Sequence, residues 1–342
     1  MIDLKNIRDF GVGFLGFEFG AREIVRLASL AEQLGFGTCW VAEDYFFRGA
    51  FSLAAACAAR TSSIRIGIGA VNPYTRHPAL TAMEVAGLAE LAGENRTILA
   101  LGASNKPWIE SMGLPYVKPR RSLEEATEII RRMLRGESVS LCGQRFQVAD
   151  VKFSISPLNC DVPIYFGVVG PKNLELAGET ADGVLLSVMT SPAYVRYARE
   201  KIQQGANKRG RKLENFDIQA YLLISMGRDR VHARNAIKPL IGSFIGMAGF
   251  FGPDPILTCT GLSPEEIKPL TELALKSENV APLVTDWMLD TFTISGTPEE
   301  CRERLDLLFE AGLTSPVAFE TPGINFEETL GNVTEHLAAH SS

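Results

Sequence analysis

Residues Ile64–Pro78 read IRIGIGAVNPYTRHP, and the rest of the chain can be interpreted outward from this stretch. Isoleucines alternate with arginine and glycines up to Gly69, which is the period of two expected of a strand. Functional side chains then follow in close succession: Asn72, Tyr74, Thr75, Arg76 and His77. Pro73 and Pro78 stiffen the turn, and Pro78 can start a helix. Ligands of α/β enzymes bind where a strand opens into such a loop, although a plain surface turn explains this stretch equally well by itself.

The composition is that of an ordinary globular protein, with 342 residues, 46% apolar and 22% charged. A net charge of −6 gives no basic field, so we expect no nucleic-acid partner. Six cysteines lie far apart without a CxxC pair, which argues against disulfides and against structural zinc. The first residues lack a signal-peptide pattern, and no apolar window is long enough to span a bilayer. We therefore expect a cytoplasmic protein with no membrane partner.

Apolar runs of strand length alternate with helix-period stripes along the chain. Ala21–Leu34, for example, has apolar residues spaced along one helix face, and Gly35 follows as a typical helix end. Eight strands are predicted, each with a helix partner: Phe10–Phe17, Thr38–Ala42, Ile64–Val71, Thr97–Leu101, Pro163–Val168, Gly183–Ser187, Phe216–Ser225 and Val317–Glu320. Repeated alternation of this kind specifies parallel strands joined by right-handed helical crossovers.

These eight alternations predict an α/β fold: one closed (β/α)8 TIM barrel that spans residues 1–342 as a single domain. Residues from about 228 to 290 are helical but rich in Gly, Phe and Pro, and we expect a helical insertion there, between the seventh and eighth strands. The insertion could be a lid or a dimer contact. A doubly wound open sheet is the alternative fold, which eight alternations disfavour.

Two local patterns lie between the fourth and fifth strands. Ser122 followed by Glu125 matches a capping box and predicts a helix over Ser122–Leu134. Val139–Val151 alternates around a glycine and predicts a small hairpin insertion.

In a barrel, the functional groups lie at the carboxyl ends of the strands. Asp44 follows the second strand and could accept a proton, hold a donor group of a bound ring, or simply cap the next helix. Tyr74 and His77 could donate to a substrate oxygen, although a histidine before proline at a helix start is often structural. Other groups at predicted strand ends include Glu43, Ser104, Asn105, Trp108 and Glu320. Glu43, Asp44 and His77 have no third partner at ligand spacing, so we predict no metal site.

Tyr165–Gly178 (YFGVVGPKNLELAG) reads as a strand followed by a Gly-Pro turn into a helix. Gly170 would allow close approach to the backbone, and the helix start together with Lys172 would suit a phosphate group. The pattern lacks the glycine spacing of a dinucleotide-binding motif, and Gly-Pro is also an ordinary helix start. Since the strand ends supply few strong acids or bases, we expect a cofactor to carry the chemistry, typically hydride transfer.

Several longer motifs resemble the bacterial-luciferase-like flavin and deazaflavin oxidoreductases, and among them the branch that uses coenzyme F420, including methylenetetrahydromethanopterin reductase. The motifs extend over nearly the whole chain apart from the insertion: Ala21–Asp44 (AREIVRLASLAEQLGFGTCWVAED), Gly69–Ala79 (GAVNPYTRHPA), Ile98–Asn105, Gly170–Leu185 (GPKNLELAGETADGVL) and Ile294–Leu305 (ISGTPEECRERL). NPYTRHP together with GPKNLELAGETADG is typical of the F420 branch.

This resemblance implies a (β/α)8 barrel, usually dimeric, with the deazaflavin ring at the strand ends. It implies a non-prolyl cis peptide at Gly69–Ala70 that backs the ring, with Asp44 nearby. It also implies that Gly170 and Ser187 hold the phosphate of the cofactor.

The chain departs from the family pattern at three positions where relatives carry acids or a histidine. Tyr45 stands where many F420 relatives have histidine, and Asn105 where sugar-phosphate-oxidising relatives have glutamate. Phe14 stands where we align the acidic residue of the pterin reductases. A proton would then have to come from another side chain: Tyr45, Tyr74, His77 or Glu43.

The leading hypothesis is a homodimeric F420-dependent oxidoreductase that transfers hydride between C5 of the deazaflavin and a small organic substrate. The alternatives are an FMN-dependent luciferase-like monooxygenase and a non-catalytic relative that binds a flavin-like ligand. The candidate catalytic residues are Asp44, Tyr45, Tyr74 and His77. The candidate cofactor-binding residues are Asp44, Gly69, Ala70, Asn72, Ser104, Val168, Gly170, Lys172 and Ser187.

Overall fold

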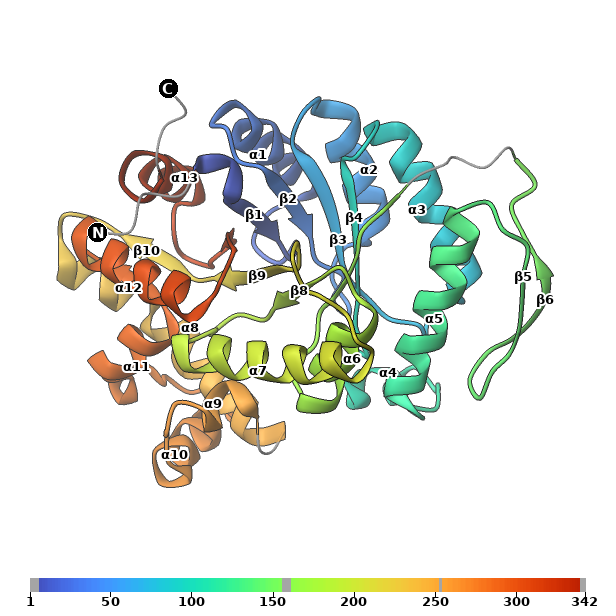
Figure 1. Cartoon of the computed structure of the whole chain (residues 1–342). Helices are drawn as coiled ribbons and strands as arrows, with labels where there is room; N and C mark the ends of the chain where they lie inside the picture. Colours follow the sequence, from blue (N-terminus) through green and yellow to red (C-terminus); the bar gives the residue numbers. More distant parts are fainter. Residues whose placement is uncertain (1–5, 156–160, 252–253, 339–342) are drawn as a thin grey trace.

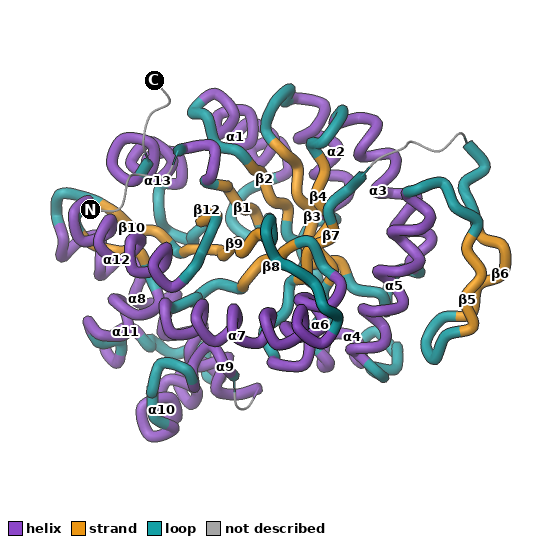
Figure 2. The backbone as a smooth tube through the Cα atoms, in the orientation of Figure 1, coloured by secondary structure: helices purple, strands orange, loops and turns teal. Residues whose placement is uncertain are grey.

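A closed barrel of eight parallel strands forms the centre of the computed structural model, which describes residues 6–155, 161–251 and 254–338 (Figures 1 and 2). The order around the barrel is β1-β12-β9-β8-β7-β4-β3-β2. The strands are β1 (Gly11–Phe14), β2 (Thr38–Val41), β3 (Arg65–Val71), β4 (Thr97–Leu101), β7 (Ile164–Phe166), β8 (Gly183–Leu186), β9 (Asp217–Leu222) and β12 (Ser315–Phe319). The predicted (β/α)8 barrel is confirmed.

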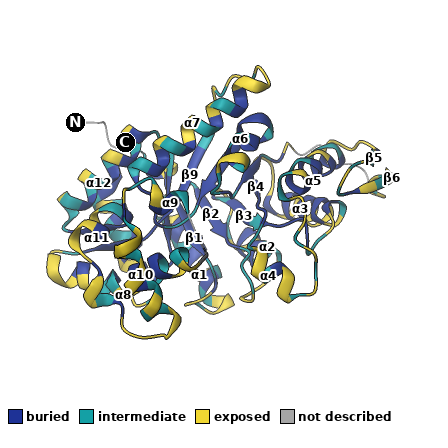
Figure 3. Ribbon diagram, turned by 90° about the horizontal axis from the view of Figure 1, so that it is seen from below, coloured by how far each residue is buried: buried dark blue, intermediate teal, exposed yellow. Residues whose placement is uncertain are grey.

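Helices surround the barrel (Figure 2), and their buried apolar side chains belong to the same core as those of the strands. They are α1 (Ala21–Gln33), α2 (Ala50–Arg60), α3 (Pro78–Ala92), α4 (Lys106–Ser111), α5 (Pro119–Leu134), α6 (Pro171–Thr180), α7 (Pro192–Lys208), α12 (Pro298–Ala311) and α13 (Phe326–Asn332), the last continued by a π-helical turn, Val333–Leu337. Figure 3 shows buried strands inside and exposed outer helix faces. The core therefore lies between the sheet and the helices, as the helix-period stripes predict.

Side chains also fill the inside of the barrel, so it is a packed core. Trp40 Nε1 donates to Gln219 Oε1 at 2.7 Å, and both side chains are buried. Tyr165 donates its hydroxyl proton to Asp217 Oδ2 at 2.8 Å. Asp217 lies at the amino end of β9, so this paired polar network occupies the end of the barrel opposite the predicted site.

Residues 224–296, between β9 and β12, form a separate layer beside the barrel. β10 (Ile224–Met226) and β11 (Ile294–Gly296) make a two-stranded parallel sheet. Between them lie α8 (Arg230–Phe251), α9 (Pro255–Thr258), α10 (Pro264–Leu275), a 3-10 turn (Ala281–Leu283) and α11 (Asp286–Phe292). The buried Arg234 of α8 donates to Asp290 of α11 at 2.6 Å, which ties the two ends of this segment together.

The bounds of two predicted strands need correction. Phe216–Ser225 is two strands, because β9 ends at Leu222 and β10 leaves the barrel to pair with β11. A continuous apolar run carries no local mark of where the pairing partner changes. Phe10–Phe17 is too long, since β1 ends at Phe14 and Gly16, with a φ of 75°, lies in the following loop.

The predicted capping box is wrong, whereas the predicted hairpin is present. α5 starts at Pro119, with Lys118 as its N-cap, so Ser122 lies inside the helix. The Glu125 carboxylate instead accepts three backbone N–H groups, from residues 144, 145 and 146, at 2.8–2.9 Å. These belong to the turn between β5 (Val139–Cys142) and β6 (Gln147–Val151). A pattern four residues long cannot reveal that a distant turn competes for the carboxylate.

No helix among the described residues is long and apolar enough to cross a membrane. Five of the six cysteines are described, and none of these five forms a disulfide. Cys39, Cys57 and Cys301 are buried and pack as small apolar side chains. The sixth, Cys160, lies outside the described residues.

Candidate active site

Loops after neighbouring strands meet at the carboxyl end of the barrel and bring aromatic rings together. Phe17, after β1, packs edge to face on Phe47, after β2, with 5.6 Å between ring centroids. The ring of Tyr45 lies 6.5 Å from Trp108 on α4. Phe17, Phe46 and Phe47 are exposed in spite of their size. Exposed apolar groups gathered at a strand end are typical of a ligand site.

The third strand carries the predicted bulge. The peptide between Gly69 and Ala70 is cis, and the pairing of β3 with β4 shifts register at this point. Two glycines make room for the bulge: a Cβ on Gly102 would lie 2.7 Å from Ala70 Cβ, and a Cβ on Gly167 would lie 2.6 Å from it. Ala70, Gly102 and Gly167 therefore form a closely packed cradle of small residues at the ends of three neighbouring strands.

Tyr45 lies at the centre of a polar network after β2. The structure has a second cis peptide, between Tyr45 and Phe46, which nothing in the sequence predicts. The Tyr45 hydroxyl is 2.9 Å from Thr75 Oγ1 and 3.2 Å from Glu43 Oε1, and it accepts from Asn72 Nδ2 at 2.6 Å. Burial is the main cause that raises the pKa of Tyr45, so its hydroxyl is protonated near neutral pH.

Asn72 is almost fully buried, and both ends of its amide are used inside the protein. Oδ1 accepts the backbone N–H groups of Tyr74 and Thr75, each at 3.0 Å, while Nδ2 donates to Tyr45. The side chain therefore fixes the turn after β3 and joins it to the loop after β2. Asn72 therefore contributes to a ligand site by fixing the conformation of these two loops.

Asp44 is a half-buried carboxyl with one hydrogen bond among the described residues, from the Tyr45 backbone N–H to Oδ1 at 3.1 Å. Burial raises the pKa of Asp44 to about 6, and the Tyr45 N–H opposes this shift. No cation offsets the burial. Asp44 can therefore accept or release a proton close to neutral pH, which an ordinary aspartate does not do.

Tyr74 and His77 have partners elsewhere. Tyr74 donates its hydroxyl proton to the Val117 carbonyl at 2.9 Å, and its ring stacks on Tyr116 at 5.0 Å. His77 is the N-cap of α3, where Nδ1 accepts the Ala79 N–H at 3.2 Å. Burial lowers the pKa of His77, which favours the neutral ring that this cap requires.

The remaining predicted cofactor residues lie on three loops at the same end of the barrel. Val168 and Gly170 follow β7, and Gly170 is the N-cap of α6 without a side-chain cap. Lys172 is exposed in the first turn of α6. Ser187 follows β8, and Ser104, with a φ of 59°, follows β4. Neither serine hydroxyl bonds another described residue, so both remain available to a ligand.

Sequence reasoning gave no role to two buried side chains at this end of the barrel. Glu320 Oε1 accepts the backbone N–H groups of Phe17 and Glu18, at 2.9 and 3.3 Å, while Oε2 is buried and has no partner in the described part of the chain. Burial raises the pKa of Glu320. Tyr221, inside β9, is the second, and its buried hydroxyl also has no partner among the described residues. A tyrosine in an apolar strand reads as core, and no local pattern reveals an unpaired hydroxyl.

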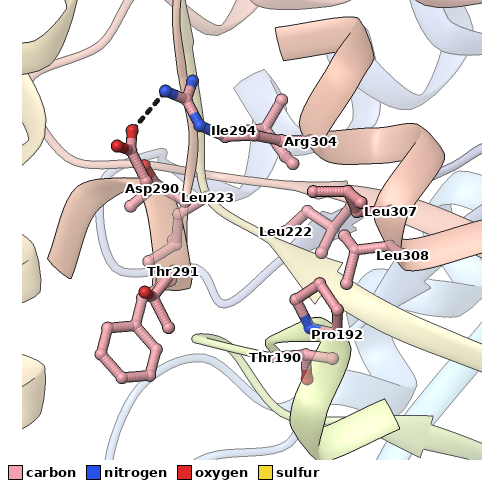
Figure 4. Close-up of a pocket in the computed structure, with 12 residues that line it drawn as sticks. Thr190, Pro192, Leu222, Leu223, Asp290, Thr291, Ile294, Arg304, Leu307 and Leu308 are labelled. Carbon is pink, nitrogen blue, oxygen red and sulfur yellow. Dashed lines mark hydrogen bonds and ion pairs between the residues drawn. The ribbon is translucent and has the colours of Figure 1, made fainter. Parts of the chain in front are cut away.

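The hollows found in the structure lie elsewhere. One of about 20 Å³, the size of a water molecule, lies between β9, α11 and α12, beside the ion pair of Asp290 and Arg304 (Figure 4). A larger one of about 420 Å³ is lined by Ile218 and Thr314, at the starts of β9 and β12. The smaller hollow reaches Thr190 in the loop after β8 and Leu222 at the end of β9, but it has room only for a water molecule, and we do not assign the function to either hollow. The described residues contain no group of three side chains suited to hold a metal ion.

Several known proteins are similar to this chain in sequence and in fold. A family model described as luciferase-like monooxygenase matches residues 10–315. The chain is 35% identical over 324 residues to a 5,10-methylenetetrahydromethanopterin reductase of Methanolobus tindarius, covering 94% of this chain and 97% of the relative. It is 36% identical over 316 residues to the reductase of that name from Archaeoglobus fulgidus, covering 90% and 92%. The solved coenzyme F420-dependent tetrahydromethanopterin reductase of Methanopyrus kandleri is similar with a TM-score of 0.87 and 30% identity, covering 96% and 97%.

Proposed function

The chain belongs to the luciferase-like monooxygenase family, and we propose that it works there as a coenzyme F420-dependent oxidoreductase. It transfers hydride between C5 of the deazaflavin and a small organic substrate. The observation that carries this function is the similarity, over almost the whole chain, to the F420-dependent reductase of Methanopyrus kandleri. The FMN-dependent monooxygenase is the second candidate, because the family model takes its description from that activity.

The residues at the strand ends fit a flat tricyclic ring. The cradle formed by Ala70, Gly102 and Gly167 carries no large side chain, because a Cβ on either glycine would clash with Ala70. We propose that the cofactor ring lies against the backbone of the bulge there. Exposed aromatic side chains of the loops after β1 and β2 would border it. When bound, the deazaflavin supplies a carbon that gives or accepts hydride. Asn72 supports this seat indirectly, through the turn that it holds.

We propose that the phosphate of the cofactor lies at the start of α6. The uncapped N-terminus of this ten-residue helix offers backbone N–H groups and the positive end of its dipole. A Cβ on Gly170 would meet nothing within 4 Å, so there is open space for a ligand beside the backbone. Lys172 adds positive charge, and the free hydroxyls of Ser187 and Ser104 add donors.

Among the candidate catalytic residues, Asp44 is the group best suited to proton transfer. Asp44 has a pKa of about 6 and few partners, so it can exchange a proton with a ligand. The Tyr45 hydroxyl already bonds Glu43, Thr75 and Asn72, so it holds the polar network beside Asp44. The Tyr74 hydroxyl proton and the His77 Nδ1 lone pair are already hydrogen-bonded within the protein. These two side chains therefore stabilise the loop after β3.

The test is an equilibrium titration of the apo-protein with F420 and, separately, with FMN, followed by ligand fluorescence. We expect F420 to bind at least 10-fold more tightly than FMN. Preference for FMN would refute the F420 assignment and support the monooxygenase. F420 binding without turnover of any compound in a substrate panel would support the non-catalytic alternative.

We also propose that the protein is a homodimer that pairs through α3. The outer face of this helix carries Leu80, Met83 and Leu91, which are 48–53% exposed in the single chain and lie beside the exposed Glu84 and Glu90. Large apolar side chains that gather on an exposed face are typical of a protein interface. Leu80→Glu should shift the mass measured by light scattering from dimer to monomer. Leu307→Glu on α12, equally exposed at 51%, should leave the mass unchanged.

A cytoplasmic location is part of the same proposal. The described cysteines are free thiols, three of them buried, which suits a reducing compartment. Fractionation of the native cells, with immunodetection of the chain, would test it.

A further inference from the structure

Two buried hydroxyls in the described barrel strands have no partner: Thr97 Oγ1 at the amino end of β4, and the Tyr221 hydroxyl near the carboxyl end of β9, where the candidate site lies. Tyr221 is 91% buried, from a relative exposure of 9%, and its oxygen accepts from and donates to no described residue. Buried polar groups are nearly always hydrogen-bonded, because an unpaired one loses its water without compensation. An unpaired hydroxyl beside a candidate active site therefore indicates a partner that comes from outside the chain.

Tyr221 is placed near the open end of the barrel. It is the residue before the last in β9, and its ring centroid lies 4.4 Å from that of Phe319, the last residue of β12. Gly13 of β1 makes room for the ring: a Cβ there would lie 2.7 Å from it. The ring therefore extends across β12 to β1. The absence of a side chain at Gly13 is what allows this position.

The Tyr221 hydroxyl is suited to donate a hydrogen bond. Burial, and after it Cys39 and Asp44, raise the pKa of Tyr221, so the hydroxyl keeps its proton. Asp44 follows β2, so it lies at the same end of the barrel as Tyr221, which is near the end of β9.

Other buried tyrosines of the described chain differ from Tyr221 in one respect. Tyr165 donates to Asp217 Oδ2 at 2.8 Å, Tyr194 to the Val169 carbonyl at 3.0 Å, and Tyr74 to the Val117 carbonyl at 2.9 Å. Each of these hydroxyls has an acceptor built into the fold.

The position of β9 indicates whether the cofactor or the substrate supplies the acceptor for the Tyr221 hydroxyl. β9 and β3 are four strands apart in a ring of eight, so they lie on opposite sides of the barrel. If the cofactor ring rests on the bulge of β3, Tyr221 faces the side of the ring that is turned away from that bulge. A substrate that exchanges hydride with the ring must lie on this open side.

We propose that the Tyr221 hydroxyl donates a hydrogen bond to an oxygen or nitrogen atom of the substrate, bonded to the carbon that exchanges hydride. The inference rests on the proposed function and gives it a substrate class: compounds whose reacting carbon carries such an acceptor. The hydrogen bond holds this carbon in place and stabilises negative charge on the heteroatom when hydride arrives.

Tyr221→Phe tests the assignment, because it keeps the ring packed on Phe319 and Gly13 and removes only the hydroxyl. The variant should melt at the wild-type temperature or above it, since an unpaired buried group is removed. It should bind F420 as the wild type does. Its kcat/KM for reduction of methylenetetrahydromethanopterin, the test substrate, should fall by about 10- to 100-fold.

Tyr165→Phe is the matched control, since it also removes a buried barrel hydroxyl, but one with a partner. It should lower the melting temperature and leave kcat/KM unchanged. An unchanged kcat/KM in Tyr221→Phe would overturn the inference, as would a 10-fold loss of F420 affinity, which would assign the hydroxyl to the cofactor. A wild-type protein that binds F420 but reduces neither the test substrate nor simple aldehydes, ketones and imines would refute the proposed function instead.

Discussion

Replacement of Asp44 by asparagine should make the protein more stable at alkaline pH while it removes the proposed proton-exchanging group. Burial raises the pKa of Asp44 from its usual 3.8 to about 6 in the folded protein. A carboxyl whose pKa is raised by folding favours the folded state while it is protonated. That stability is fully present below pH 3.8 and is lost as the pH rises through about 6.

The magnitude follows from the size of the shift. A shift of about 2 pKa units corresponds to about 3 kcal/mol at 1.36 kcal/mol per unit. This is an upper limit, because solvent still reaches part of the side chain. We therefore expect Asp44→Asn to be more stable than the wild type by about 1–2 kcal/mol at pH 8, and by about a third of that at pH 4.5. The amide oxygen of asparagine can still accept the Tyr45 N–H.

Urea denaturation at pH 4.5 and pH 8 measures this difference. Asp9→Asn, at an exposed position, serves as the control for the loss of one negative charge. The same Asp44 variant should lose at least 10-fold in kcat, since asparagine cannot exchange a proton at this pH. A stability difference that is equal at both pH values, or a variant that is less stable at pH 8, would refute the argument.

Two further substitutions test the proposed cofactor cradle and the turn between β5 and β6. Gly167→Ala places a Cβ 2.6 Å from Ala70 Cβ. We expect its F420 affinity to fall at least 10-fold while its circular dichroism spectrum is unchanged. Gly331→Ala, at a position with open space around it, is the control and should bind F420 normally. Unchanged binding in Gly167→Ala would contradict the proposed cradle. Glu125→Gln removes the charge that holds three backbone N–H groups of the β5–β6 turn, and we expect a loss of about 2–3 kcal/mol in urea denaturation, with faster amide exchange at residues 144–146. A loss below about 0.5 kcal/mol would show that the turn does not depend on Glu125.

Most of the fold could be predicted from the sequence, because its signals are local. The alternation around Ile64–Gly69 and the helical stripe of Ala21–Leu34 repeat in equivalent form along the chain, and eight such units close into a barrel. The predictions that went wrong depended on distant partners. β10 leaves the barrel because β11 offers it an edge, and Glu125 turns to a hairpin that follows about 20 residues later.

The candidate site was predicted less completely. The resemblance implied the cis peptide at Gly69–Ala70, and the structure has it. The residue types of Asp44 and Tyr45 were likewise visible at a strand end. The sequence could not distinguish Asp44 from Tyr45, Tyr74 and His77, because the difference lies in whether the polar side-chain atom already has its partners within the protein.

The sequence by itself determined the class of the fold and the family to which the motifs point, and it predicted which end of the barrel carries the site, since all three depend on residue patterns along the chain. Only the tertiary structure decided which polar groups are free. Tyr221 has an unpaired hydroxyl because β9, β12 and β1 are neighbours and Gly13 leaves space for its ring. Burial and hydrogen bonding are set by residues far apart in the sequence, so the chemistry of a site is decided when the chain closes into its barrel.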